Sequence, residues 1–84
     1  MELKEQFEQA VDNSKLLQEK PDNDVLLQLY SLYKQATAGN APEEGGYNMF
    51  DFVGKAKHEA WKKLRNVTEE QAMRQYVDLV QTLR

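Results

Sequence analysis

The chain contains no cysteine, and only two prolines, one tryptophan and one histidine among its 84 residues. Without cysteine it can form neither a disulfide framework nor a thiolate metal site, which fits a reducing, cytoplasmic setting. No apolar run approaches the ~20 residues of a bilayer-spanning helix, and residues 1–5 lack the basic start of a secretory signal. We therefore expect one small cytoplasmic domain over residues 1–84, without stable membrane insertion.

A dominant positive charge is also missing. The net charge of −3 argues against nucleic acid as a partner, because proteins that bind nucleic acids carry a strongly basic surface. Residues 55–65 nevertheless hold five basic side chains against Glu59 alone. These bases form either a solvated helix face or a local anion site on an acidic protein.

Catalytic and metal-binding patterns are sparse. His58 has Glu59 as its neighbour, but adjacent helical residues point away from each other, so the pair is not a metal motif. The chain has no glycine-rich phosphate loop of Walker or Rossmann spacing. We therefore predict no enzyme activity, no metal and no cofactor. The chain either binds a ligand or packs against a partner.

Apolar residues recur at spacings of three and four along most of the chain, which predicts helices over residues 3–17, 23–38 and 52–64 and a fourth after Thr68. The inner stripes of the four helices are, in order, Leu3, Phe7, Ala10, Val11, Ser14 and Leu17; Val25, Leu29, Leu32, Tyr33 and Ala36; Phe52, Ala56, Ala60 and Leu64 with Trp61; and Ala72, Tyr76, Leu79, Val80 and Leu83 with Met73 and Val77. The predicted fold class is therefore all-α, a four-helix bundle.

Helix boundaries are marked by residues with strong local preferences. Pro21 ends the first helix, because the residue before a proline disfavours the helical region. The other boundary residues are Asp22, Asn23 and Asp24 before the second helix, Gly39–Asn40 after it, Asp51 before the third, Asn66 after it, and a Thr68–Gln71 capping box at the start of the fourth.

Residues 40–50 form a long loop between the second and third helices. A proline and two glycines exclude regular structure through its middle, yet Tyr47, Met49 and Phe50 are apolar for a linker. We therefore expect this loop to pack across the bundle.

The stretch from Tyr30 to Gly39 has the character of a ligand site. On a helix, Tyr30 and Lys34 lie one turn apart on one face, with Tyr33 beside them. Two phenol rings and an ammonium make a flat, apolar surface that donates hydrogen bonds. Such a surface suits an aromatic ring carrying phosphates, as in a nucleotide.

Two long motifs resemble the acyl-CoA-binding protein family. The first is Tyr-x-x-Tyr-Lys-Gln-Ala-Thr-x-Gly at residues 30–39, and the second is Asp-Phe-x-Gly-Lys-Ala-Lys-x-x-Ala-Trp at residues 51–61. Residues 70–73 with Tyr76, and Phe7 with Ala10, extend the resemblance over nearly the whole chain. It implies an up-down-down-up bundle with a long loop between helices two and three. It also implies a fatty acyl-CoA carrier and pool former without catalysis.

The resemblance also implies where the ligand lies. Tyr30, Tyr33 and Lys34 would hold the adenine and 3′-phosphate end, and Lys57 would contact phosphate. The full set of implied contacts is Lys15, Tyr30, Ser31, Leu32, Tyr33, Lys34, Lys57 and Tyr76, with Leu26, Leu27 and His58 along the acyl chain. Each has a simpler interpretation: the tyrosines and leucines belong to the core, and the lysines are solvated.

Two positions depart from the family pattern. Val53 stands where the family often has lysine, and His58 stands where it commonly has tryptophan. These departures bear on affinity and on selectivity for medium or long acyl chains. Three functions stay open: a monomeric acyl-CoA carrier, a helical protein-interaction module that kept the fold but not the ligand, and an enzyme or a fragment of one.

Overall fold

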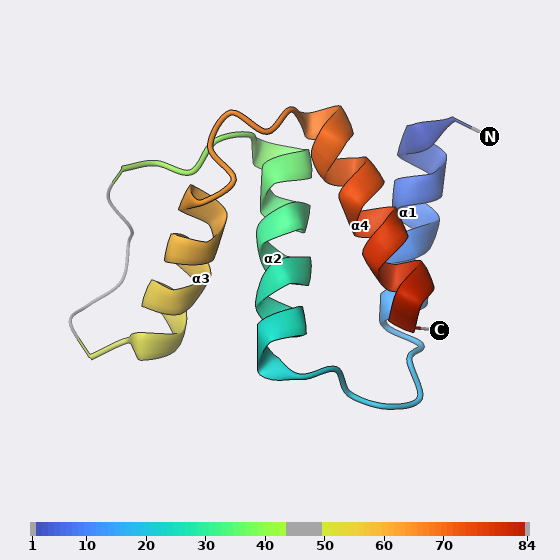
Figure 1. Ribbon diagram of the computed structural model, residues 1–84, viewed down its shortest axis with the longest axis horizontal. Coiled ribbons are helices and arrows are strands. Elements are labelled where there is room, and N and C mark those ends of the chain that lie inside the picture. Colours follow the sequence, from blue (N-terminus) through green and yellow to red (C-terminus); the bar gives the residue numbers. More distant parts are fainter. Residues whose placement is uncertain (1, 44–49, 84) are drawn as a thin grey trace.

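The structure, a computed structural model, describes residues 2–43 and 50–83, and this part of the chain forms four helices and no strand. The helices are α1 (Leu3–Ser14), α2 (Asn23–Ala38), α3 (Phe52–Lys62) and α4 (Glu69–Leu83). Figure 1 shows α1 and α4 running in one direction and α2 and α3 in the other. The predicted all-α, up-down-down-up bundle is therefore confirmed.

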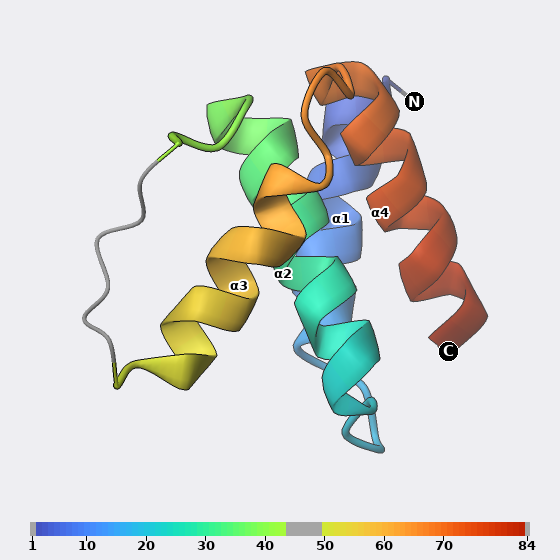
Figure 2. The same ribbon diagram turned by 60° about the vertical axis from the view of Figure 1, so that its left-hand side comes forward.

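The four helices lie in the spatial order α3, α2, α4, α1. α4 packs between α1 and α2, while α3 packs on α2 alone among the described helices (Figures 1 and 2). The Cα atoms span 41 × 29 × 15 Å, so the bundle is broad and thin. α3 is thus attached along one side only.

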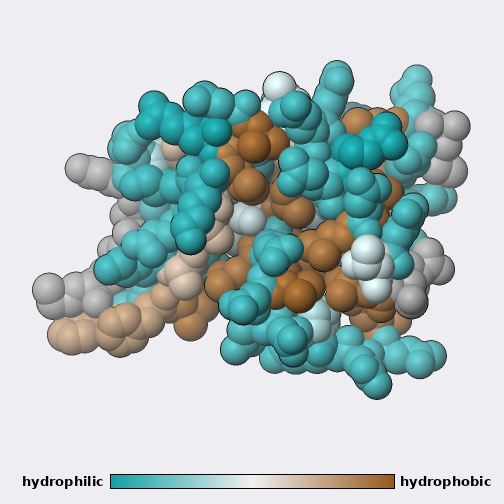
Figure 3. Space-filling view, viewed as in Figure 1, coloured by the Kyte–Doolittle hydropathy of each residue, from teal (hydrophilic) through white to brown (hydrophobic). Residues whose placement is uncertain are grey.

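The hydrophobic core lies where α1, α2 and α4 meet. Its nine buried apolar residues are Phe7, Ala10, Leu29, Leu32, Ala36, Ala72, Tyr76, Val77 and Val80. The Phe7 ring stands edge-on to the Tyr76 ring, with 5.2 Å between the centroids, an arrangement that aromatic pairs prefer. Hydrophobic residues also gather over α2 and α4 on the face shown in Figure 3. α3 contributes none of the nine core residues.

The predicted bounds of α2 match the structure, but α1 and α3 end earlier than predicted. After Ser14, and from Leu64 onward after α3, the backbone N–H groups bond to carbonyls three residues back, which tightens the chain out of the α-helix. The Ser14 hydroxyl also donates to the Val11 carbonyl at 2.7 Å. Lys15 therefore lies just beyond α1 instead of inside it.

Most predicted helix caps are present. Asp51 Oδ1 accepts from the Gly54 N–H at 2.9 Å, and Thr68 and Gln71 form the reciprocal bonds of a capping box. Gly39 has φ 79° and ψ −150°, a region open essentially to glycine alone. Asp22 occupies the N-cap position of α2, but its side chain makes no capping hydrogen bond.

Several core predictions were wrong. Phe52 is 73% exposed and Tyr33 42% exposed, although the helical stripes placed both inside. Three polar side chains, Ser31, Gln35 and His58, are buried instead. Phe50 is exposed and does not cover the bundle, while Tyr47 and Met49 lie outside the described residues. The apolar stripe thus marks two different surfaces, one in the core and one open to solvent.

Candidate ligand site between α2 and α3

A reciprocal set of four side chains joins α2 to α3. α2 carries Tyr30 and Lys34, and α3 carries Lys57 and Trp61, each pair one helical turn apart. The two helices run in the same direction (Figure 1). Each lysine therefore meets the ring on the other helix. Lys57 Nζ lies 5.2 Å from the Tyr30 ring centroid, and Lys34 Nζ lies 4.9 Å from the Trp61 ring centroid. Both distances are typical of cation–π contacts.

The two ammonium groups have no carboxylate partner in the described part of the chain. Within residues 2–43 and 50–83, the ion pair is Arg65–Glu43 at 2.7 Å, and it lies on exposed side chains. An ammonium has three N–H donors, and an aromatic face does not satisfy any of them as fully as a hydrogen bond donated to a phosphate oxygen would. The four side chains therefore present two positive charges to an incoming anion.

An apolar groove of about 400 Å³ lies beside these charges, at the start of α3. It is lined by Asn23, Leu26, Leu27, Phe52, Val53, Ala56 and Lys57. The exposure of Phe52 and Val53, 73% and 65%, follows from this position, because the groove is open to solvent. Apolar surface next to paired cations suits an amphiphile with an anionic head and a hydrocarbon chain.

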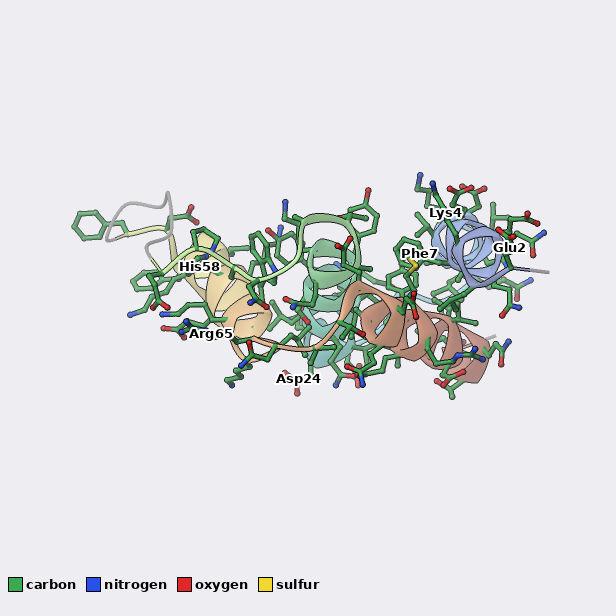
Figure 4. All side chains as sticks on the ribbon, turned by 90° about the horizontal axis from the view of Figure 1, so that it is seen from above. Glu2, Lys4, Phe7, Asp24, His58 and Arg65 are labelled. Carbon is green, nitrogen blue, oxygen red and sulfur yellow. The ribbon has the colours of Figure 1, made fainter. Side chains whose placement is uncertain are left out.

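A second cavity, of about 680 Å³, lies on the other side of α2, toward α1. Its lining is Lys4, Phe7, Glu8, Val11, Asp12, Tyr33, Ala36, Thr37, Glu69 and Met73. Phe7 reaches into this space from α1 (Figure 4), and its ring stacks on Tyr33 at 6.0 Å and 24°. The Phe7 ring thus supports one face of the partly exposed Tyr33 ring.

Hydrogen bonds tie the end of α2 to the neighbouring connections. Gln35, which is fully buried, donates through Nε2 to Asn40 Oδ1 at 2.9 Å and to the Val67 carbonyl at 2.8 Å. The Asn66 N–H donates to the same Asn40 oxygen, and Asn66 itself has φ 73°. Trp61 Nε1 donates to the Gly39 carbonyl at 2.8 Å. These bonds fix the position of Trp61 relative to α2.

The structure divides the residues named from the sequence into four groups. The α2–α3 side brings together Leu26, Leu27, Tyr30, Lys34 and Lys57, while Tyr33 faces the α1 side. Ser31, Leu32, His58 and Tyr76 are buried, and Lys15 is exposed beyond α1.

None of these four buried residues lines the groove, and two of them have identified side-chain partners. His58 stands edge-on to Trp61, with 6.4 Å between ring centroids, and its position on α3 is marked in Figure 4. The Tyr76 hydroxyl donates to Ser14 Oγ at 3.1 Å. Among the described residues, no helix is long and apolar enough to cross a bilayer, and no group of three His, Asp or Glu side chains is arranged to hold a metal.

Sequence reasoning missed Trp61 as part of this site and assigned it to an inner stripe. The sequence does carry a signal for it. Tyr30 and Lys34 on one helix are matched by Lys57 and Trp61 at the same spacing on the other. When two neighbouring helices run in parallel and their registers match, the lysine of each pair can contact the aromatic ring of the other pair.

Comparisons with known proteins agree on one family. A family model described as acyl CoA binding protein matches residues 4–80. An acyl-CoA-binding protein homolog of Manduca sexta is 41% identical over 83 residues, which cover 99% of this chain and 92% of that protein. The crystal structure of Oryza sativa acyl-CoA-binding protein 2 superposes with a TM-score of 0.88 at 35% identity, covering 98% of this chain and 90% of that one.

A longer relative also matches. Enoyl-CoA delta isomerase 2 of Rattus norvegicus is 49% identical over 79 residues, which cover 92% of this chain but 19% of that protein. The match therefore concerns one part of the isomerase. The chain belongs to the acyl-CoA-binding protein family, as its two long motifs predicted.

Proposed function

We propose that the chain binds medium- and long-chain acyl-CoA thioesters as a monomeric cytoplasmic carrier and pool former, without catalysis. The observation that carries the proposal is the pair of cations on aromatic rings beside an open apolar groove. Membership of the acyl-CoA-binding protein family supports the same ligand.

The proposed ligand runs across α2 from one side to the other. The adenine base packs on the exposed Tyr33 ring with Tyr30 at the edge of its site, the 3′-phosphate meets Lys34 and Lys57, and the acyl chain enters the groove at Leu26 and Leu27. Burial of the chain contributes ~0.8 kcal/mol per methylene, so affinity rises with chain length. The charged contacts set the position of the head group.

The buried residues support the site from beneath. Tyr76 packs on Phe7, and Phe7 packs on Tyr33. Through Phe7, Tyr76 therefore supports the Tyr33 ring on which the adenine base packs. Ser31 and Leu32 anchor α2 from its buried side, and His58 packs against Trp61. Lys15 adds a screened attraction for phosphate, which at an exposed site is worth little.

An open groove fits a carrier better than an enzyme. A carrier must release its ligand to other proteins, and the groove opens to solvent beside Phe52 and Val53. The alternative is a helical interaction module that kept the fold but not the ligand. The exposed Phe52 and Val53 side chains are the observation that favours it.

Calorimetric titration with palmitoyl-CoA, octanoyl-CoA and free CoA tests the proposal. We expect binding that strengthens with chain length and that falls at least tenfold in Lys34→Ala, because a charge-assisted bond to phosphate is lost. Lys62→Ala is the matched control: it removes an exposed lysine on α3 that does not line the groove. Binding of none of the three ligands, or equal loss in both variants, would contradict the proposal.

A further inference from the structure

The Trp61 ring has no assigned part in ligand binding, yet it lies under one of the two cations. Lys34 Nζ is 4.9 Å from its centroid, and the indole N–H is fixed by the 2.8 Å bond to the Gly39 carbonyl. We propose that Trp61 is a positioning residue that holds the Lys34 ammonium ready for a phosphomonoester. This inference rests on the proposed function, because it concerns the same ligand.

The cation–π contact restricts a side chain that otherwise has many rotamers. A free lysine loses that freedom when it binds phosphate, which weakens binding. Lys34 is half-buried and already rests on the Trp61 face before any ligand arrives. An ammonium has three N–H donors, so the ring face leaves donors that can still bond to an acceptor. Phosphate can therefore bind the ammonium without displacing it from the ring.

The ring itself is held on two sides. The bond from Nε1 goes to Gly39, whose backbone conformation is one that other residues rarely adopt. His58 meets the indole edge-on, with the ring planes at 82°. The Trp61 ring therefore keeps its position when the Lys34 side chain moves. It thus holds the Lys34 ammonium in a fixed position relative to α2 and α3.

The second lysine makes the site selective for a dianion. Lys57 lies on the Tyr30 ring one turn along the same pair of helices, so both ammonium groups lie on the same α2–α3 boundary. A terminal phosphomonoester carries nearly two negative charges near neutral pH and offers three acceptor oxygens. A ligand without that group gains nothing from the fixed position of Lys34.

Fluorinated tryptophan tests this arrangement without changing the size of the side chain. Trp61 is the only tryptophan in the chain, so biosynthetic replacement alters this ring alone. Fluorine withdraws electron density from the ring face and weakens its attraction for a cation, while the indole N–H and the shape are kept. Palmitoyl-CoA and its 3′-dephospho analogue are then titrated against the unlabelled, monofluorinated and difluorinated proteins.

We expect the affinity for palmitoyl-CoA to fall in steps with fluorination, by about two- to fivefold in all. The affinity for the 3′-dephospho analogue should stay constant, and Lys34→Met should abolish the dependence on fluorine for palmitoyl-CoA. Urea unfolding of each labelled protein monitors the fold. An equal fall for both ligands, or no fall for either, overturns the positioning role. Failure of the unlabelled protein to bind palmitoyl-CoA overturns the proposed function as well.

Discussion

The two sides of α2 differ in almost every respect. Toward α4, the helix buries Leu29, Leu32 and Ala36 in the common core. Toward α3 it presents Tyr30 and Lys34, which meet a lysine and an indole across a boundary that remains partly open. One helix thus serves stability on one side and, in our proposal, ligand binding on the other.

This difference teaches that the apolar residues of the chain have two separate uses. Core residues are covered by α1, α2 and α4, whereas the groove residues between α2 and α3 remain open to solvent and, in our proposal, contact the acyl chain. Because α3 adds nothing to the nine-residue core, changes on its inner side should alter affinity more than folding. Substitutions on the two sides should therefore separate the two properties.

Leu32→Ala should have the largest effect of these substitutions, and that effect should be a loss of stability. Leu32 is 5% exposed within the core, so the substitution leaves a cavity and lowers the free energy of unfolding by ~2–5 kcal/mol. Urea unfolding followed by circular dichroism measures this loss. A loss below ~1 kcal/mol would mean that the core side is not the source of stability.

Gln35→Leu should have the second-largest effect, again a loss of stability. The side chain is fully buried and donates to the Val67 carbonyl and to Asn40, so an apolar replacement leaves these acceptors short of a donor. We expect a loss of ~1–3 kcal/mol in the free energy of unfolding. Gln35→Glu, at neutral pH, is the companion variant: it keeps the shape but also removes the donor, so it should be no more stable than the leucine variant.

Leu26→Ala should act mainly on the ligand. Leu26 is half-buried and lines the groove, so its loss should lower the affinity for palmitoyl-CoA by roughly three- to tenfold. Free CoA, which has no acyl chain, should bind as before. Calorimetry with both ligands checks this, and an equal effect on the two would place the acyl chain elsewhere.

Val53→Lys should have the smallest effect. Val53 is 65% exposed at the groove, and an added surface charge near phosphates is worth ~0–1 kcal/mol. We expect at most about a fivefold gain in affinity at low salt, which disappears as the ionic strength rises. A gain that persists at high salt would indicate a buried contact that this geometry does not provide.

The fold was predictable from the sequence because local signals and the family resemblance agreed. The bounds of α2 followed from the acidic and asparagine residues at its start and from Gly39 at its end. α1 and α3 were predicted too long, because apolar spacing continues through their tightened last turns. Hydrogen-bond geometry, not residue type, ends these helices.

The candidate site was predictable in part. Tyr30, Lys34 and Lys57 do meet at the α2–α3 boundary. The periodic pattern did not reveal that Phe52 is exposed, because an apolar groove has the same composition as a core. It also did not reveal that Gln35 is buried, because the Gln35 hydrogen bonds to Asn40 and to the Val67 carbonyl depend on the tertiary structure. The contact between Lys34 and Trp61, on which the proposed role of Trp61 rests, depends on the register between α2 and α3. The sequence pattern of a single helix does not reveal that register.

Amide chemical-shift mapping during a titration with palmitoyl-CoA tests the central claim most directly. We expect the largest shifts at Leu26, Tyr30, Lys34 and Lys57, on the α2–α3 side. The exposed residues of α4, such as Asp78 and Thr82, should show only small shifts. Shifts concentrated on α4, or none at saturating ligand, would contradict it and would place binding away from the α2–α3 groove or exclude it.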